Sequence, residues 1–423
     1  MLLDFSLENF GPFRDRTTFS LQATKRGEHQ ENVIPCGTLK SGILSSVSVF
    51  GPNASGKSYL FQAFRALSSI VSDAFVEGFR YPWYHPFKLD DTHAHGPISL
   101  GIRFIEEDIV YEYAVSFVKD HVVSESLVYR PMGRPRMVFR RCDGNETFSP
   151  KQKKMKAFLT PASTFLVIGA KYNDEVCAKV RNMILGLIIL ESEDISHMAE
   201  LSYAWASDDP SRKKAIIEGL RKADLGIVDF DSTEHVLDRE SIRSEIPPTL
   251  FDRIPSDEDG KLKFGSIRLV HGFCDHGNET RRIPFEIELE STGTVCMFGM
   301  MGPLMDALMN GRTLIIDEFG SHLHPILTRW LVSQFSSENN PNRAQLVVMT
   351  HDVGLMDTDE LLRRDQIYFT DKDRRDGSST LYCLSDFRGV RKDEIVLKSY
   401  LLGRYDAVPE VTFRGLMDGQ RHR

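Results

Sequence analysis

The sequence predicts an α/β protein with a mixed sheet, an antiparallel β lobe and a helical insertion. Three observations carry this prediction. Apolar β runs alternate with helices in both terminal regions, as in a parallel sheet. Strand patterns joined by charged turns fill residues 97–130, as expected of antiparallel hairpins. Helical signals dominate residues 153–225.

The N-terminal region, residues 1–152, is expected to form one lobe. Apolar side chains alternate in β fashion over residues 3–7, and a further strand at 44–50 leads through a glycine-bearing loop into a helix at 59–75. Residues 131–152 are rich in Pro, Arg and Lys, which favours a loop.

The middle region, residues 153–262, is predicted to be a helical insertion and linker, with helices at 173–190 and 211–223. An acidic, proline-containing stretch at 233–262 ends it. Strands resume in the C-terminal lobe, residues 263–423. The expected elements there are strands at 263–271 and 282–290, a helix at 295–309, a strand at 313–316, a helix at 325–337 and a strand at 345–349.

Composition excludes several classes of protein. Hydrophobic residues make up 41% of the 423 and charged residues 26%, which excludes a mainly disordered or collagen-like chain. The formal net charge of −8 argues against a surface that is basic overall and binds phosphate groups generally, although it is compatible with a local basic patch. The longest apolar run, residues 183–190, is far shorter than a membrane span. We therefore expect no membrane partner. The six cysteines lack CxxC spacing, which fits unpaired thiols in a reducing cytoplasm.

The loop after the strand at 44–50 fits the pattern GxxxxGK[ST], with an apolar strand before it and a helix after it. Glycines let backbone N–H groups turn around a phosphate, and the helix adds its positive N-terminus. Lys57 is expected to neutralise β- and γ-phosphate oxygens, and the Ser58 hydroxyl to ligate Mg²⁺. The alternative is an unrelated turn that contains glycine. The predicted nucleotide-binding residues are Gly51, Pro52, Asn53, Ala54, Ser55, Gly56, Lys57, Ser58 and Tyr59.

A second part of the site is predicted at the end of the strand at 313–316, which runs into Asp317 and Glu318. Asp317 is expected to reach the Mg²⁺ shell, and Glu318 to act as general base on the attacking water. Taken alone, such a strand end could equally lead into a solvated loop. The phosphate-binding loop predicted at residues 51–58 (the P-loop) favours the functional interpretation. Lys57 and Asp317 are 317 − 57 = 260 residues apart, so a large insertion separates the two halves.

With these motifs, the chain resembles the ABC/SMC/RecF class of P-loop ATPases. More narrowly, it is similar to the AAA-family ATP-binding proteins of bacterial abortive-infection and phage-defence systems. The resemblance implies a two-lobed ATPase head and covers nearly the whole chain. The matching segments are LENFGPFRD at 7–15, LESTGT at 289–294, FGSHLHP at 319–325, TH at 350–351 and YLLGRYD at 400–406.

The resemblance also implies residue roles. Phe13 and Arg14 would approach the adenine, and His351 would contact the γ-phosphate and the attacking water. Ser291 and Gly293 lie in the signature-like segment, whose helix would point its N-terminus at the γ-phosphate held by another subunit. A helix cap without a ligand is an equally good account of that segment.

Several features depart from the class or lie outside the predicted site. No Gln lies between residues 65 and 108, where the class carries its Q-loop glutamine. Glu290 replaces the expected Leu of the signature, and Asp406 stands where Gly is expected. A metal cluster around His322 and His324 is not expected, because each of these positions already has a role in the resembled motifs or at a helix cap. The DxD sequence at 371–373 is expected to be a solvated hairpin turn.

These features predict an ATP-hydrolysing switch that uses ATP and Mg²⁺. By resemblance, it would form a homodimer or higher homo-oligomer through an ATP sandwich. It would then control a separately encoded effector, a nuclease or toxin, in bacterial antiviral defence. One alternative is a RecF-like DNA-binding repair ATPase, which basic segments at 134–141 and 151–156 permit. The other is a nucleotide-binding scaffold without turnover.

Overall fold

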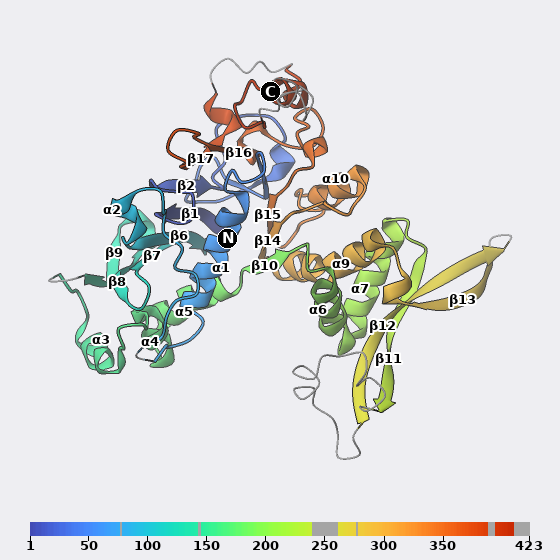
Figure 1. Cartoon of the computed structure of the whole chain (residues 1–423), viewed down its shortest axis with the longest axis horizontal. Coiled ribbons are helices and arrows are strands. Elements are labelled where there is room, and N and C mark those ends of the chain that lie inside the picture. Colours follow the sequence, from blue (N-terminus) through green and yellow to red (C-terminus); the bar gives the residue numbers. More distant parts are fainter. Residues whose placement is uncertain (77, 143–144, 239–260, 276–277, 388–393, 410–423) are drawn as a thin grey trace, which may run out of the picture. The chain divides into compact units, whose positions relative to one another are not determined.

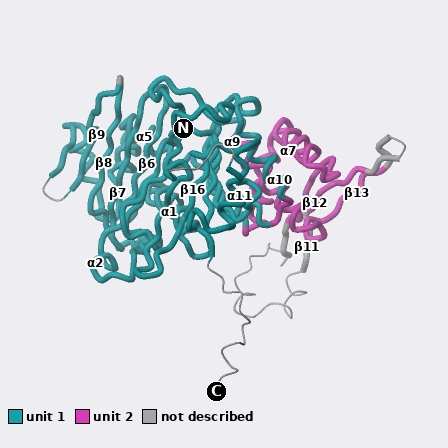
Figure 2. Tube along the Cα trace, turned by 90° about the horizontal axis from the view of Figure 1, so that it is seen from above, with its two compact units in different colours: residues 1–192, 307–321, 325–423 teal, residues 193–306, 322–324 magenta. Residues whose placement is uncertain are grey.

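The computed structural model describes residues 1–76, 78–142, 145–238, 261–275, 278–387 and 394–409 (Figure 1). The chain divides into two compact units (Figure 2). The first comprises residues 1–192, 307–321 and 325–423, and the second comprises residues 193–306 and 322–324.

These units differ in extent from the three regions expected from the sequence. Residues 153–192 belong to the first unit, because helical side chains such as Phe165 and Cys177 are buried in its core. Residues 263–306 belong to the second unit, because the strand that begins at Lys261 pairs along its length with Ile227–Asp238.

One sheet of the first unit is antiparallel, with strand order β2-β1-β6-β7-β8-β9. Leu3, Phe5 and Leu7 alternate along β1 and are buried on one face, as the period-2 pattern predicts. The strands are β1 Leu2–Glu8, β2 Thr17–Ser20, β6 Ile98–Glu106, β7 Ile109–Phe117, β8 Val122–Arg130 and β9 Arg136–Cys142.

The other large sheet is mixed, with order β10-β14-β15-β5-β16-β17. Only its β16–β17 pair is antiparallel among the described strands. Every residue of β5, β14 and β15 is buried, as expected of parallel strands covered on both faces. The strands are β5 Ser46–Phe50, β10 Ile188–Glu191, β14 Thr313–Asp317, β15 Gln345–Met349, β16 Ile367–Lys372 and β17 Ser379–Cys383. The predicted combination of a mixed sheet and an antiparallel β lobe is confirmed.

Helix α1, Lys57–Ile70, connects the two sheets of the first unit. Its Phe64 ring stacks on Phe5 of β1 with centroids 3.8 Å apart, and the helix also contacts β14 and β15. Gln345 adds polar links between the sheets: its side chain accepts from the Leu2 N–H at 2.6 Å and donates to the Leu2 carbonyl at 2.9 Å.

The first unit also contains shorter elements. No helix in the described part of the chain is both long and apolar enough to cross a bilayer. The shorter elements are β3 Val33–Ile34, β4 Ile43–Leu44, α2 Asp91–Ala94, α3 Pro150–Met155, α4 Phe165–Lys171, α5 Glu175–Leu185, α10 Pro325–Ser333 and α11 Val396–Leu401.

Two local predictions were wrong. The expected loop at 131–152 contains β9 and α3. β9 is an edge strand that pairs on one side only, and most of its side chains are not buried, so its sequence lacks the apolar alternation that would have predicted a strand. The expected helix at 173–190 ends with α5, and Gly186 caps it. β10 follows as an apolar strand, which periodicity cannot distinguish from a buried helix segment.

The second unit combines helices with an antiparallel sheet of order β11-β12-β13. The methionine-rich helix α9 packs on it through Phe298, whose ring lies edge-on to Phe230 at 5.1 Å. Gly219 of α7 lies against Met301, so that a Cβ there would come within 2.6 Å of the Met301 sulfur. The elements are α6 Ile195–Ser207, α7 Pro210–Lys222, β11 Ile227–Asp238, β12 Lys261–Asp275, β13 Asn278–Glu286 and α9 Thr292–Asn310, whose last residues belong to the first unit.

A fully buried arginine holds the chain just ahead of β16 against residues 24–28. Arg363 makes two 2.8 Å hydrogen bonds to the Asp365 carboxylate. Its remaining donors reach the carbonyls of Thr24, Arg26 and Glu28. Asp365 in turn accepts from the Thr24 N–H at 2.7 Å. The ion pair is therefore compensated by backbone groups, as a buried pair must be.

Arg363→Ala is expected to lower the free energy of unfolding by about 3–5 kcal/mol, because it leaves Asp365 as a buried charge without its cation. Urea denaturation followed by circular dichroism measures this. Arg375→Ala is the control, since that side chain is exposed and pairs with Asp373 at the surface. Equal denaturation midpoints for the two variants would contradict the role given to Arg363.

Candidate active site

The P-loop begins where β5 ends, between β15 and β16. Gly51 has φ +154° and lies against β16, so that a Cβ there would sit 2.4 Å from the Thr370 carbonyl oxygen. Gly56 has φ +115°, and a Cβ added there would lie 3.0 Å from the nearest atoms of the Phe13 ring. Side chains are excluded at both positions, and the loop turns directly into α1.

A hydroxyl pair ties the loop to the neighbouring strand. The Ser55 and Thr370 hydroxyl oxygens are 2.6 Å apart, and the Thr370 hydroxyl also donates to the Phe50 carbonyl at 3.3 Å. Thr370 was not predicted as a site residue. Its place beside the P-loop depends on the pairing of β16 with β5, which the local sequence does not encode.

The Lys57 ammonium lies under the loop. The side chain is buried and donates to the Gly51 carbonyl at 2.8 Å and the Pro52 carbonyl at 3.2 Å. Burial lowers the pKa of Lys57, and the negative charges of Glu318 and Asp317 act in the opposite direction. The P-loop lysine and the acidic strand end therefore lie in one electrostatic site.

Asp317 ends β14 and is buried. Burial raises its pKa to about 6, while the neighbouring Ser58 hydroxyl acts in the opposite direction and favours the ionised form. Its Oδ1 atom is buried and has no hydrogen-bond partner in the described part of the chain. An orphaned carboxylate oxygen beside a hydroxyl suits a hard cation, so Ser58 and Asp317 fit Mg²⁺.

The described residues contain no group of three or more His, Cys, Asp or Glu side chains arranged to hold a metal. A cluster built on His322 and His324 is thus not found among them. A single carboxylate with one hydroxyl is instead the usual protein share of a Mg²⁺–nucleotide site, in which phosphates and water supply the remaining ligands.

Glu318 adopts a left-handed backbone conformation, with φ +52°. Its carbonyl accepts hydrogen bonds of 2.6 Å from both the Ser192 and the Ser321 hydroxyls. Ser192 also donates to the Asp317 carbonyl at 2.8 Å. These bonds hold the acidic pair in place. Ser192 was missed because it follows β10, which the sequence analysis assigned to a helix.

His351 follows β15 and is exposed. The preceding Thr350 hydroxyl donates to the Phe319 carbonyl at 2.6 Å and so joins the loop after β15 to the loop after β14. Partial desolvation and the positive charge of Lys57 lower the pKa of His351, and Glu318 opposes them. The three residues predicted to be catalytic, Lys57, Glu318 and His351, are therefore close enough to influence one another.

The two residues expected near the adenine differ in exposure. Arg14 lines a cavity of about 910 Å³ with Pro52, Asn53 and the β16–β17 turn. Its guanidinium pairs with Asp376 at 2.8 Å. Phe13 is fully buried behind Gly56, so its ring offers no surface to a ligand in this arrangement.

Tyr59 is 39% exposed at the start of α1, and its ring covers Gly11. The expected solvated hairpin is present, but its turn lies further along the chain: Asp371 and Lys372 still belong to β16, and residues 373–378 connect that strand to β17.

The signature-like segment lies in the second unit, whereas the P-loop and β14 lie in the first. The Ser291 hydroxyl accepts from the Thr294 N–H at 3.1 Å and so caps α9. Gly293 approaches the backbone closely, since a Cβ there would be 3.0 Å from the His322 carbonyl oxygen. The local geometry is that of a helix cap, and an anion-binding role for Ser291 and Gly293 stays a prediction.

A strand, a glycine-bearing loop with a buried lysine, a helix and an acidic neighbouring strand together define a P-loop nucleotide-binding protein. Residues 209–357 match the family model described as "AAA domain, putative AbiEii toxin, Type IV TA system". The matched segment covers 149 of the 423 residues and includes the acidic strand end of β14, so the chain is similar to this family over about a third of its length.

Solved structures of low similarity include SMC heads. The SMC head domain from Thermotoga maritima is 12% identical, with 90% of this chain and 98% of that chain covered and a TM-score of 0.40. An SMC head bound to the C-winged helix domain of ScpA is 14% identical, with 90% and 97% covered and a TM-score of 0.44. No curated protein matches the chain significantly.

Gly51→Ala is expected to weaken ATP binding at least about tenfold, because the added methyl group pushes the loop away from Thr370. Titration with a fluorescent ATP analogue measures this. Gly27→Ala is the matched control, since no atom lies within 4 Å of the Cβ position there. Unchanged affinity in Gly51→Ala would refute the close-packing argument.

Ser192→Ala is expected to slow ATP turnover by about tenfold while leaving ATP affinity within about twofold, because it removes a hydrogen bond that positions the acidic pair. Steady-state phosphate release and ligand titration separate the two effects. Ser72→Ala serves as control, because that exposed hydroxyl bonds only to the Ser69 carbonyl among the residues that the structure describes. A loss of affinity without a loss of turnover would contradict this role.

Proposed function

We propose that the protein is a cytoplasmic, Mg²⁺-dependent ATPase that works as a molecular switch. The observation that carries this proposal is the convergence of Lys57 with Asp317 and Glu318, although 317 − 57 = 260 residues separate Lys57 from Asp317. The Ser58 hydroxyl beside the buried Asp317 carboxylate supports it further. These are the groups that phosphoryl transfer needs: a phosphate-binding cation, metal ligands and a base.

The proposed mechanism assigns one task to each residue. When nucleotide binds, the Lys57 ammonium group gives up its hydrogen bonds to the loop carbonyls and donates to phosphate oxygens instead. Ser58 and Asp317 would hold Mg²⁺, which would supply positive charge to stabilise the phosphates during the reaction. Glu318 accepts a proton from the attacking water. A lowered pKa keeps His351 neutral near pH 7, so that it orients the water or γ-phosphate by hydrogen bonding.

We further propose that two ATP molecules are enclosed between two copies of the chain. Each site would be completed by the segment Ser291–Gly293 of the second copy. The exposed Ser291 at the start of a long helix supports this, because the unsatisfied N–H groups and dipole of the first turn attract an anion.

The biological setting proposed is bacterial antiviral defence of the abortive-infection type. The description of the matched family, a putative AbiEii toxin of a Type IV TA system, supports this setting. In it, ATP binding and hydrolysis would restrain or release a separately encoded effector, either a nuclease or a toxin. A neighbouring gene for such a protein would support the proposal independently.

Glu318→Gln is expected to retain ATP affinity and to lower turnover by about 100-fold or more, since general-base catalysis contributes on that scale. The ATP-bound dimer should then persist in size-exclusion chromatography. Lys57→Ala should instead weaken ATP binding itself. Phosphate release and ATP titration on both variants test the assignments.

Three results would contradict the proposed function. Equal turnover for wild type and Glu318→Gln removes the assigned base. No phosphate release by the wild type makes the protein a nucleotide-binding scaffold. ATPase activity that depends on DNA, with steep salt dependence, indicates a RecF-like repair enzyme instead.

A further inference from the structure

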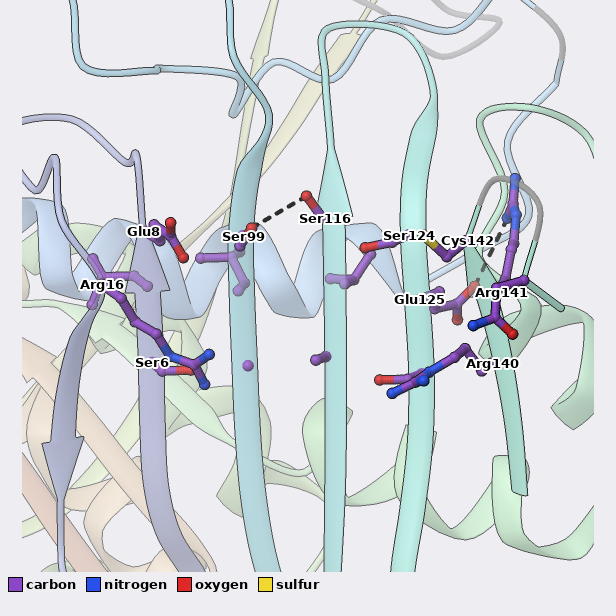
Figure 3. Close-up of a pocket in the computed structure, with 17 residues that line it drawn as sticks. Ser6, Glu8, Arg16, Ser99, Ser116, Ser124, Glu125, Arg140, Arg141 and Cys142 are labelled. Atoms are coloured by element: carbon purple, nitrogen blue, oxygen red, sulfur yellow. Dashed lines mark hydrogen bonds and ion pairs between the residues drawn. The ribbon is translucent and has the colours of Figure 1, made fainter. Parts of the chain in front are cut away.

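A groove crosses the face of the antiparallel sheet opposite its buried core (Figure 3). We call it the serine groove; its volume is about 360 Å³. Phe5 and Leu7 of β1 point into the core, so Ser6 and Glu8 lie on the other face. The strand pairing aligns short side chains in two rows. One row is Ser6, Gly101, Ala114 and Ser126, and the other is Ser99, Ser116 and Ser124.

Small side chains create the depth of this groove. Gly101 leaves room for the Ser6 hydroxyl, which would lie 2.6 Å from a Cβ at that position. Ala114 is exposed in the middle of β7. The Ser99 and Ser116 hydroxyls are 3.2 Å apart across neighbouring strands. The groove thus exposes hydroxyl groups that can both donate and accept hydrogen bonds.

An arginine stands at each end of the serine groove. Figure 3 shows Arg16 and Arg140 extending over the sheet from opposite sides. Both are exposed, and neither side chain forms an ion pair or hydrogen bond with any residue that the structure describes.

Other arginines of this sheet are already paired. Arg103 binds Asp4, and Arg130 binds Glu112 at 3.1 Å. Within the part of the chain that the structure describes, the charges of Arg16 and Arg140 are therefore unpaired and face the groove. Arg16 directly precedes β2 and Arg140 lies on β9, so their backbones are five inter-strand spacings apart, or about 24 Å. The two guanidinium groups lie closer together than this, because both side chains extend inward over the sheet (Figure 3).

We propose that the serine groove binds an extended acidic peptide segment of a partner protein. Carboxylates of the segment would pair with Arg16 and Arg140, and its backbone N–H and C=O groups would bond to the serine hydroxyls. An extended chain of about six residues spans the distance between the two ends. No P-loop residue lines the groove, so this inference stands apart from the proposed ATPase activity.

The lining favours a peptide over nucleic acid. None of its residues is aromatic, so unpaired bases would have no stacking partner. A nucleic-acid strand brings one phosphate per nucleotide, whereas the groove offers two open cations and an exposed carboxylate, Glu8. Hydroxyl groups satisfy both the donors and the acceptors of a peptide backbone, while phosphates need donors alone.

The test uses the full-length protein and a fluorescein-labelled hexapeptide with glutamate at both ends and serine, glycine and alanine between. Fluorescence anisotropy gives its affinity, and a peptide with glutamine in both terminal positions is the comparison. R16E/R140E should weaken binding at least about tenfold, because both carboxylates lose their partners and meet like charges. Ala114→Leu should weaken it similarly by filling the groove without a change of charge.

Arg136→Glu is the matched control, because Arg136 is exposed on the same edge strand but does not line the groove. It should bind the acidic peptide within about twofold of wild type. Circular dichroism confirms that each variant is folded. The proposal is overturned if both peptides bind equally, if neither binds, or if R16E/R140E and Ala114→Leu bind like wild type. Tighter binding of a single-stranded or duplex DNA oligonucleotide, lost in R16E/R140E, would also overturn it.

Discussion

The buried ammonium of Lys57 is the constraint on which the arrangement of the first unit depends. A cation removed from water must be compensated, and here the loop carbonyls of Gly51 and Pro52 supply hydrogen bonds while Asp317 and Glu318 supply negative charge. The carboxyl ends of parallel strands meet at one edge of a sheet. The strand order β14-β15-β5 therefore brings the acids to the lysine, whatever length of chain lies between them.

The sequence was sufficient where the chemistry is local. The spacing of Gly51, Gly56, Lys57 and Ser58 predicts a loop between a strand and a helix, and the structure has that loop. The positive φ angles of Gly51 and Gly56 and the Lys57 hydrogen bonds to the Gly51 and Pro52 carbonyls all lie within the loop itself. The antiparallel hairpins β6–β7–β8 were equally predictable, because short charged turns join strands that pair with their neighbours in sequence.

The sequence was insufficient where distant segments meet. Thr370 and Ser192 contact the P-loop and the acidic strand end only through the register of β16 and β10, which no spacing reveals. Phe13 and Arg14 are adjacent in sequence, yet one side chain is buried and the other lines a cavity. That difference follows from the tight turn in which the backbones of Phe10 and Phe13 pair, and from the packing of the Phe13 ring behind Gly56, which the resemblance does not specify.

The serine groove and the P-loop are joined by a short path within one unit. β1 carries Ser6 on its groove face and Phe5 on its core face, and Phe5 stacks on Phe64 of α1, the helix that begins with Lys57. Packing of this density transmits a displacement rather than absorbing it. A ligand in the groove nevertheless alters nucleotide affinity only if this packing has two arrangements and the ligand has a higher affinity for one of them. By linkage, bound nucleotide must then change the affinity of the groove for its ligand by the same factor. That reciprocity distinguishes a regulatory groove from a passive docking surface.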